Sequence, residues 1–244
     1  MNILITYITV CYNSEETITK CLKSIISQKN KHIEYIVIDG KSSDKTFNII
    51  KKYKRGVDYV MSKKDNGMYH AMNKAVKKSK GKYLCFINSD DWLNKKSNNI
   101  IINHIKNYPS VDIFYGNQDI YSKNKFLYCD NANHHNLRSY MSISHQSCYI
   151  KKKIFNNKKY SNKLKLSSDY EFFLYLYLKN FSFKKIEHSF TSFRTGGLSS
   201  NQSLMMKEFL WVQKKYNSLF IATINYVYRY KFTFIKLFFK KIFK

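Results

Sequence analysis

The chain has 244 residues, of which 44% are hydrophobic, with one proline and a formal net charge of +27. This composition is typical of a globular protein and excludes a disordered, collagen-like or linker-dominated chain. The positive charge favours anionic partners, namely nucleic acid, phospholipid surfaces or phosphorylated substrates. Five cysteines without a Cys-x-x-Cys pair argue against zinc or a disulfide framework and for a reducing cytoplasm.

Short β-branched apolar runs alternate with helical patterns through the first half of the chain. The patterns predict strands over 3–10, 33–38, 57–61 and 83–87, and helices over 15–28, 42–53 and 67–79. Asn13 or Ser14 is available to cap the first of these helices. Strands that alternate with helices predict a doubly wound, mostly parallel α/β sheet.

After Trp92 the alternation becomes less regular and predicts a mixed second half. We expect a helix over 98–106, a strand over 113–115, a hairpin through 120–128 and a helix over 168–178. From about Leu204 the sequence becomes a basic, aromatic and amphipathic helical tail. The N-terminus does not look like a signal peptide, and no window is apolar enough to predict a membrane-spanning helix.

Acidic side chains follow the predicted strands where an α/β sheet normally holds its ligand. Asp39 ends the second strand, Asp65 precedes a helix, and Asp90 with Asp91 follows the fourth strand. The phosphate-binding patterns Gly-x-Gly-x-x-Gly and Gly-x-x-x-x-Gly-Lys are absent, so a divalent metal held by paired carboxylates would have to neutralise nucleotide phosphates. The alternative readings are a plain strand exit for Asp39 and a helix cap for Ser89 or Asp90.

Four segments, taken in order, resemble family 2 glycosyltransferases, the inverting enzymes with a GT-A fold that build bacterial surface polysaccharides. The similarity covers residues 1–95 and extends more loosely to Gly197. It rests on Thr9-Val10-Cys11-Tyr12-Asn13, Ile36-Val37-Ile38-Asp39-Gly40-Lys41-Ser42-Ser43-Asp44, Asp65-Asn66-Gly67-Met68-Tyr69 and Asn88-Ser89-Asp90-Asp91.

The resemblance implies roles for these residues. Asp39 and Asp65 are expected to hold the nucleobase and ribose, and Asp90 to bind a Mn²⁺ or Mg²⁺ ion that bridges the diphosphate. Asp91 or Asn88 would complete or support the metal shell. Asn88 departs from the family pattern, because it stands at the first position of its Asp-x-Asp motif. His70 departs too, since many members have Asp there.

The second half is expected to supply the acceptor site and a base. Ser168-Asp169-Tyr170-Glu171-Phe172 resembles the segment that carries the family's catalytic Asp, so Asp169 is the candidate base, or else a helix N-terminal acid favoured by the helix dipole. His145 is expected to line the acceptor pocket or to be structural. Arg194, before Gly196-Gly197, is expected on a mobile loop in contact with the diphosphate, or on a plain surface turn.

The resemblance divides the chain into a GT-A catalytic domain over 1–203 and the helical tail over 204–244. Within the domain, 1–95 would bind the nucleotide-sugar and 96–203 the acceptor. The stretch 229–244 is rich in Lys and Arg and contains no Asp or Glu. A basic aromatic helix of this kind predicts contact with an anionic membrane surface. The alternative is a tail packed on the catalytic domain.

The leading hypothesis is a cytoplasmic, peripheral membrane enzyme that uses a UDP-sugar and a divalent metal. Its acceptor would be a lipid-linked glycan of a surface polysaccharide such as an O-antigen or capsule. The chain lacks the Gln-x-x-Arg-Trp motif of processive synthases, so it should add one sugar per acceptor. A nucleic-acid-binding protein is the second hypothesis, although no known nucleic-acid motif supports it. A non-catalytic membrane-surface adaptor is the third, and the presence of the four candidate acids argues against it.

Overall fold

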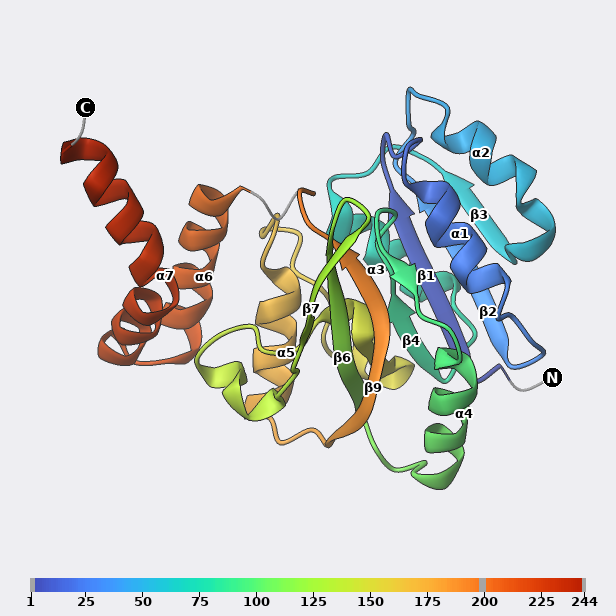
Figure 1. The fold of residues 1–244 in the computed structure, drawn as a ribbon. Helices are drawn as coiled ribbons and strands as arrows, with labels where there is room; N and C mark the ends of the chain where they lie inside the picture. Colours follow the sequence, from blue (N-terminus) through green and yellow to red (C-terminus); the bar gives the residue numbers. More distant parts are fainter. Residues whose placement is uncertain (1–2, 198–200, 243–244) are drawn as a thin grey trace.

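The computed structural model describes residues 3–197 and 201–242, and of 232–242 the backbone alone. One mixed sheet of nine strands crosses the described chain in the order β3-β2-β1-β4-β8-β6-β9-β5, with β7 beside β6 (Figure 1). The strands are β1 Ile5–Cys11, β2 Ile33–Asp39, β3 Tyr59–Ser62, β4 Tyr83–Phe86, β5 Trp92–Leu93, β6 Ile113–Ser122, β7 Lys125–Asp130, β8 Cys148–Lys151 and β9 Phe183–Arg194. The helices are α1 Ile18–Ile26, α2 Thr46–Lys52, α3 Met68–Lys78, α4 Ser97–Asn107, α5 Ser168–Leu178, α6 Gln202–Tyr216 and α7 Leu219–Ile242.

The first half is the predicted parallel α/β unit. Strands β3, β2, β1 and β4 lie side by side and all run parallel. Every residue of β1, β2 and β4 is buried, which explains why these strands read as unbroken apolar runs. Helices α1, α2 and α4 cover one face of the sheet, and α3 and α5 cover the other. The order of strands in the sheet reverses between β1 and β4, because β2 and β3 lie on one side of β1 and β4 lies on the other. An α/β sheet opens a crevice for a ligand at such a point.

The second half is mixed, as expected, but its strands differ from the prediction. The predicted strand over 113–115 and the first arm of the predicted hairpin are one strand, β6, which turns into β7. Strands β5, β8 and β9 were not predicted. β8 joins the halves by antiparallel pairing to both β4 and β6, and β9 runs parallel to β6. These pairings extend one continuous sheet from the first half of the chain into the second.

The predicted cap of the first helix is wrong. The N-cap of α1 is Thr17, which makes no side-chain cap hydrogen bond. The Asn13 side chain instead accepts a hydrogen bond from the Ser43 backbone N–H at 2.9 Å, and Ser42 Oγ accepts one from the Asn13 N–H. Asn13 therefore links the loop after β1 to the loop after β2, and φ of +49° gives it the turn that this requires.

The C-terminal residues form two helices, α6 and α7, which lie beyond α5 on the side away from the main sheet (Figure 1). An apolar cluster joins them to α5, with Leu174 from α5, Phe209 and Val212 from α6, and Tyr230 from α7. The tail is thus helical, as predicted, and its first helix packs on α5. No described helix combines the length and the apolar content needed to cross a membrane.

Candidate active site

A cavity of about 1500 Å³ opens at the carboxyl ends of β1 and β4 and extends to α6 and α7. It exceeds the usual volume of a single small-molecule site, so a donor and part of an acceptor fit together. Two of the predicted site residues, Asp39 and Asp91, do not line it. The predicted site residues that do line it are Asp65, Asn88, Asp90, His145, Asp169 and Arg194.

Asp65 lines the cavity from the loop before α3. Lys74, from α3, donates to Asp65 Oδ1 at 2.5 Å, and His70 Nδ1 lies 3.5 Å from the same oxygen. Oδ2 is buried and has no hydrogen-bond partner among the described residues. His70 and Lys74 are four residues apart and share one helix face, so α3 positions both of them against this carboxylate. The free oxygen is suited to accept from a ribose hydroxyl or a base N–H.

Asn88 and Asp90 lie side by side in the loop after β4. Burial raises the pKa of the Asp90 carboxyl, and the positive charge of Arg194 only partly offsets this. Asn88 Oδ1 is buried without a partner in the described chain. Gly197 packs so closely on Asp90 that a Cβ there would lie 2.7 Å from Oδ2. A larger residue at 197 would require the Asp90 carboxylate to move, and Gly196 before it has φ of +100°, which favours glycine.

Asp91 points away from the cavity and is fully buried. Its oxygens accept from the Arg194 backbone N–H and from Gln146 Nε2, both at 3.0 Å. Burial, together with the neighbouring Asp90 charge, raises the pKa of Asp91 well above its usual value. The protein's own donors already occupy both oxygens. Asp91 thus fixes the start of the Arg194 loop, and the described contacts favour a supporting role over direct metal binding.

Asp39 lies just behind the cavity wall and is fully buried. Its carboxylate accepts from the Ser42 N–H and hydroxyl and from the Ser62 hydroxyl. Through these contacts it holds together the ends of β2 and β3, beside Gly40, which does line the cavity. A direct contact from Asp39 to a nucleobase would require the two serines to release it.

Asp169 faces the middle of the cavity from the first turn of α5. Tyr69 Oη and the Tyr170 backbone N–H donate to its Oδ1, both at 2.9 Å, and His145 Nδ1 lies 3.0 Å from Oδ2. Burial acts to raise the pKa of Asp169, but the hydrogen bond and charge of His145, together with the two other donors, outweigh it and lower the pKa. The carboxylate therefore stays ionised at neutral pH, as a base must. The structure brings His145 and Asp169 together.

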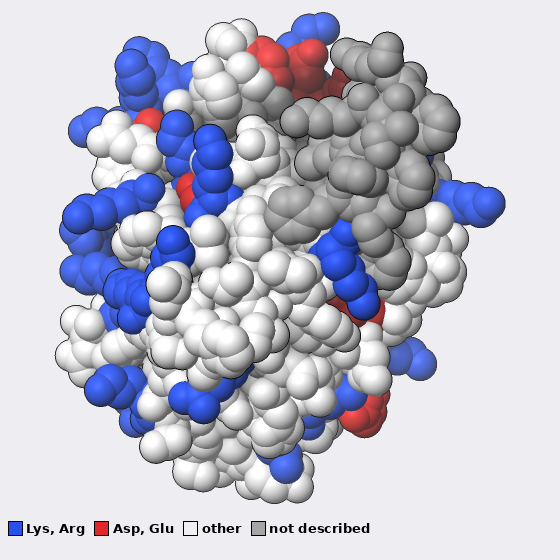
Figure 2. Space-filling model, turned by 90° about the vertical axis from the view of Figure 1, so that its left-hand side faces the viewer, with Lys and Arg blue, Asp and Glu red and all other residues white. Residues whose placement is uncertain are grey.

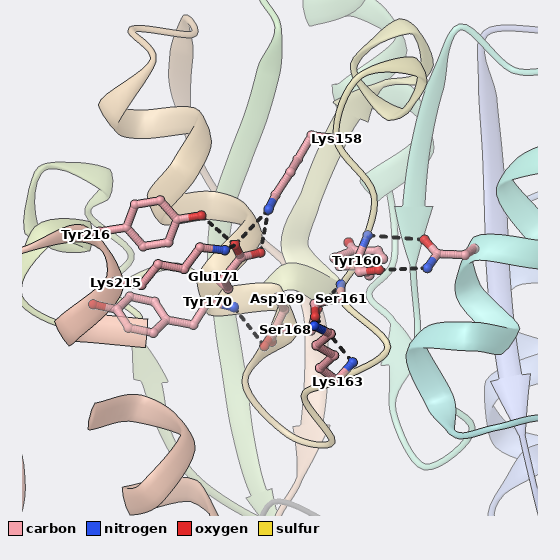
Figure 3. A network of polar contacts seen from close by, with 11 residues as sticks. Lys158, Tyr160, Ser161, Lys163, Ser168, Asp169, Tyr170, Glu171, Lys215 and Tyr216 are labelled. Atoms are coloured by element: carbon pink, nitrogen blue, oxygen red, sulfur yellow. Dashed lines mark hydrogen bonds and ion pairs between the residues drawn. The ribbon is translucent and has the colours of Figure 1, made fainter. Parts of the chain in front are cut away.

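Glu171, two residues further along α5, is turned the other way. Figure 3 shows Lys158, Lys215 and Tyr216 gathered around its carboxylate, with the two lysine ammonium groups 2.6–2.8 Å from its oxygens. Burial acts to raise the pKa of Glu171, and these three donors outweigh it and lower the pKa. Glu171 does not line the cavity. It is a structural link between α5 and the end of α6.

Sequence reasoning missed the cavity residues that come from α6 and α7. These are Met205, Phe209, Arg229 and Tyr230, together with Met141 from the loop before β8. The amphipathic pattern of the tail shows that one face is apolar but not what that face packs against. Tyr69 was missed as a partner of Asp169 because the two are one hundred residues apart in sequence.

The residues present fit a divalent metal at the donor end. No group of three His, Cys, Asp or Glu residues that could hold an ion occurs in the described chain. Mg²⁺ and Mn²⁺ need fewer protein ligands when substrate phosphates complete the shell, and one or two carboxylates are then enough. Asp90 and the free amide oxygen of Asn88 supply two hard oxygen donors in the cavity. They are the residues that would hold the ion.

Two curated relatives match about half of the chain. WfaP of Escherichia coli, a UDP-Glc:alpha-D-GlcNAc-diphosphoundecaprenol beta-1,3-glucosyltransferase, is 32% identical over 126 residues, 51% of this chain and 49% of WfaP. The poly-beta-1,6-N-acetyl-D-glucosamine synthase of Staphylococcus aureus is 28% identical over 125 residues, 50% of this chain and 30% of the synthase. The chain therefore spans less than half the length of these curated relatives.

Solved structures show the same fold. Staphylococcus aureus TarS 1–349 in complex with UDP-GlcNAc matches with a TM-score of 0.73 and 20% identity, over 86% of this chain and 64% of TarS. The mannosyltransferase PcManGT of Pyrobaculum calidifontis, in complex with GDP-Man and Mn²⁺, matches with a TM-score of 0.67 and 13% identity, over 88% and 64%. The model of glycosyl transferase family 2 matches residues 6–186. The chain belongs to glycosyltransferase family 2.

Proposed function

We propose that the protein is an inverting, metal-dependent glycosyltransferase that moves one hexosyl unit from a UDP-sugar to a lipid-linked glycan acceptor. One observation supports the proposal: the carboxylate of Asp169, whose pKa is lowered, and the oxygen-bearing side chains of Asn88 and Asp90 line one cavity in a family 2 chain. Inverting sugar transfer needs a base for the acceptor hydroxyl and a positive charge for the departing diphosphate. Asp169 would supply the base, and an ion held by Asn88 and Asp90 would supply the positive charge.

The donor would bind with its nucleoside near Asp65 and its diphosphate near Asp90 and Arg194. A divalent ion held by Asn88 and Asp90 would neutralise the charge that develops on the leaving diphosphate. Arg194 lies close enough to Asp90 for its charge to lower the pKa of that carboxyl, which places its guanidinium near the same phosphates. Asp39 remains a proposed donor residue that acts through the loop it organises.

The transfer itself would depend on Asp169. Its carboxylate takes the proton of the acceptor hydroxyl while that oxygen attacks the anomeric carbon from the side opposite the diphosphate, so the configuration inverts. Tyr69 and the Tyr170 N–H hold one carboxylate oxygen in place. His145 holds the other and keeps the group ionised. This arrangement fixes a base within reach of an acceptor without a change of backbone conformation.

The acceptor class is proposed from chemistry and likeness together. WfaP acts on a diphosphoundecaprenol-linked sugar according to its name. The absence of Gln-x-x-Arg-Trp supports one addition per acceptor. A lipid-linked acceptor in a surface polysaccharide pathway, O-antigen or capsule, would bring the protein to the inner face of the plasma membrane as a peripheral protein. The net charge of +27 and the basic stretch 229–244 support contact with anionic lipid there. The side chains of 232–244 lie outside the described residues.

The test is a thermal-shift panel of nucleotide sugars, each with and without Mn²⁺, because a bound ligand raises the melting temperature by mass action. We expect one UDP-sugar to stabilise the protein, more strongly with Mn²⁺ than without. The selected donor is then incubated with lipid-linked acceptors, and the configuration of the new linkage is read by NMR. No stabilisation by any nucleotide sugar, with salt-dependent DNA binding instead, would favour the nucleic-acid hypothesis.

A further inference from the structure

Two arginines line the cavity from its two sides. Arg194 ends β9 and lies near Asp90, whereas Arg229 comes from α7. In Figure 1, α5 with the proposed base lies between the main sheet and the α6–α7 pair. Among the side chains that the structure describes, neither arginine makes an ion pair with an acid. An unpaired guanidinium in a cavity is suited to an anionic ligand. The donor diphosphate accounts for Arg194, and Arg229 is left without one.

The walls beside Arg229 are aromatic and apolar. The rings of Tyr170 and Phe209 stack with centroids 5.4 Å apart, and Tyr230 meets Phe209 edge-on at 5.7 Å. The Arg229 guanidinium lies 5.8 Å from the centre of the Tyr140 ring, which holds it at the cavity side of α7. Met141 and Met205 complete this end of the cavity. An exposed cation beside an apolar, aromatic end of the cavity fits a ligand that carries an anion on a hydrocarbon chain.

The outer face of the same helix is apolar and exposed. Seven large hydrophobic side chains of α6 and α7 are 42–75% exposed, which is more than half of all such residues in the described chain. They are Trp211, Leu219, Phe220, Ile221, Ile224, Val227 and Tyr228. Figure 2 looks at this side of the molecule and shows a broad uncharged area bordered by Lys and Arg, with few Asp or Glu. An apolar face with a basic border is complementary to an anionic bilayer.

We propose that the α6–α7 end of the cavity is the binding site for the diphosphate and first isoprenoid units of a lipid-linked acceptor, with Arg229 as the diphosphate ligand. The lipid would leave the cavity past Tyr230 toward the exposed face of α7, which lies in the bilayer surface. This inference rests on the proposed function, because it assigns a place to the acceptor of that reaction. It is a second anion site, separate from the donor site at Asp90 and Arg194.

The test measures binding of a short probe, farnesyl diphosphate, by calorimetry in the presence of excess UDP and Mn²⁺. We expect wild-type protein to bind it more tightly than farnesol or inorganic diphosphate. Arg229→Gln should weaken binding by roughly tenfold to a hundredfold, the usual effect of losing a hydrogen bond between charged groups. Arg229→Lys, which keeps the charge but not the planar fork, should fall in between. Arg55→Gln is the matched control, an exposed arginine outside the cavity.

Three results would overturn the assignment: an unchanged dissociation constant in Arg229→Gln, an equal loss in Arg55→Gln, or displacement of the probe by UDP. The melting temperature and UDP affinity of each variant show that it is folded. Because the readout is binding of the probe, it needs no sugar transfer. Failure of the donor panel and failure of this site are therefore separate results.

Discussion

Replacing Asp169 by asparagine separates the chemistry of this carboxylate from its place in the fold. An asparagine oxygen can still accept from Tyr69 and from the Tyr170 N–H, so only the contact with His145 changes in kind. A hydrogen bond to a charged group contributes about 1.5–3 kcal/mol. In a chain of this size the melting temperature should then fall by about 3–12 °C. The variant should fold and should bind UDP with Mn²⁺ as the wild type does.

Turnover should fall much further, by a factor on the order of 10²–10⁴, because the variant has no base for the acceptor hydroxyl. Donor binding is followed by thermal shift and turnover by transfer of labelled sugar to a lipid-linked acceptor. Asp58→Asn is the matched control, since it removes one charge and weakens contacts with Lys29 and the Tyr35 N–H outside the cavity. Its turnover should be unchanged. Near-normal turnover of a folded, donor-binding Asp169→Asn protein would refute the assignment of the base.

Three more predictions concern the residues around this one. His145→Gln should raise the pKa of Asp169, because the substitution removes the main group that lowers this pKa against the effect of burial. The acid limb of the pH profile of kcat should then move to higher pH. An acid limb that stays in place would contradict this. Asp90→Ala should abolish the Mn²⁺-dependent part of the UDP thermal shift. In the wild-type protein, the affinity for Mn²⁺ should weaken as the pH falls through the raised pKa of Asp90, because protonation removes the carboxylate ligand. Mn²⁺ titrations at several pH values measure this. Removal of 229–244, or the double substitution Phe220→Ser with Ile224→Ser, should release the protein from anionic vesicles in co-sedimentation. The control Phe126→Ser, on β7, should not. Equal sedimentation of all variants would show that the tail has a packing role only.

The first half of the fold could be predicted because β1, β2 and β4 are buried on both faces and its helices are short and periodic. Three strands of the second half, β5, β8 and β9, could not be predicted from the sequence pattern. β5 has only two residues, and β9 buries the polar side chains Thr191 and Ser192. Their hydroxyls pair with Ser147 and Asn94, partners that are distant in sequence. β8 contains a buried lysine, Lys151, whose ammonium group reaches Ser110 and Asp112. No alternating apolar pattern marks such strands.

The sequence predicted only part of the candidate site. The topology alone indicates that acids after parallel strands gather at one sheet edge, and Asp65 and Asp90 do so. Neighbouring residues in a loop point in different directions, so the sequence could not separate Asp90, in the cavity, from Asp91, behind it. Asp39 occupies the expected edge, but Ser42 and Ser62 engage its carboxylate. The packing of α6 and α7 on α5 depends on tertiary contacts that the sequence pattern does not show. For this reason the sequence could not assign Arg229 to the cavity.

The contacts of Glu171 link the stability of α5 to the C-terminal helix α6. Two of the three side chains that donate to this buried acid, Lys215 and Tyr216, lie at the far end of α6, beyond the last strand of the sheet. A shortened protein that stops before α6 would lose two of the three donors to this carboxylate and keep only the ion pair between Glu171 and Lys158. One that stops after Asn217 would keep all three. In a relative with a different C-terminal segment, we therefore expect that segment to supply equivalent donors to the acid of α5, or position 171 to carry another residue, two positions from the proposed base Asp169.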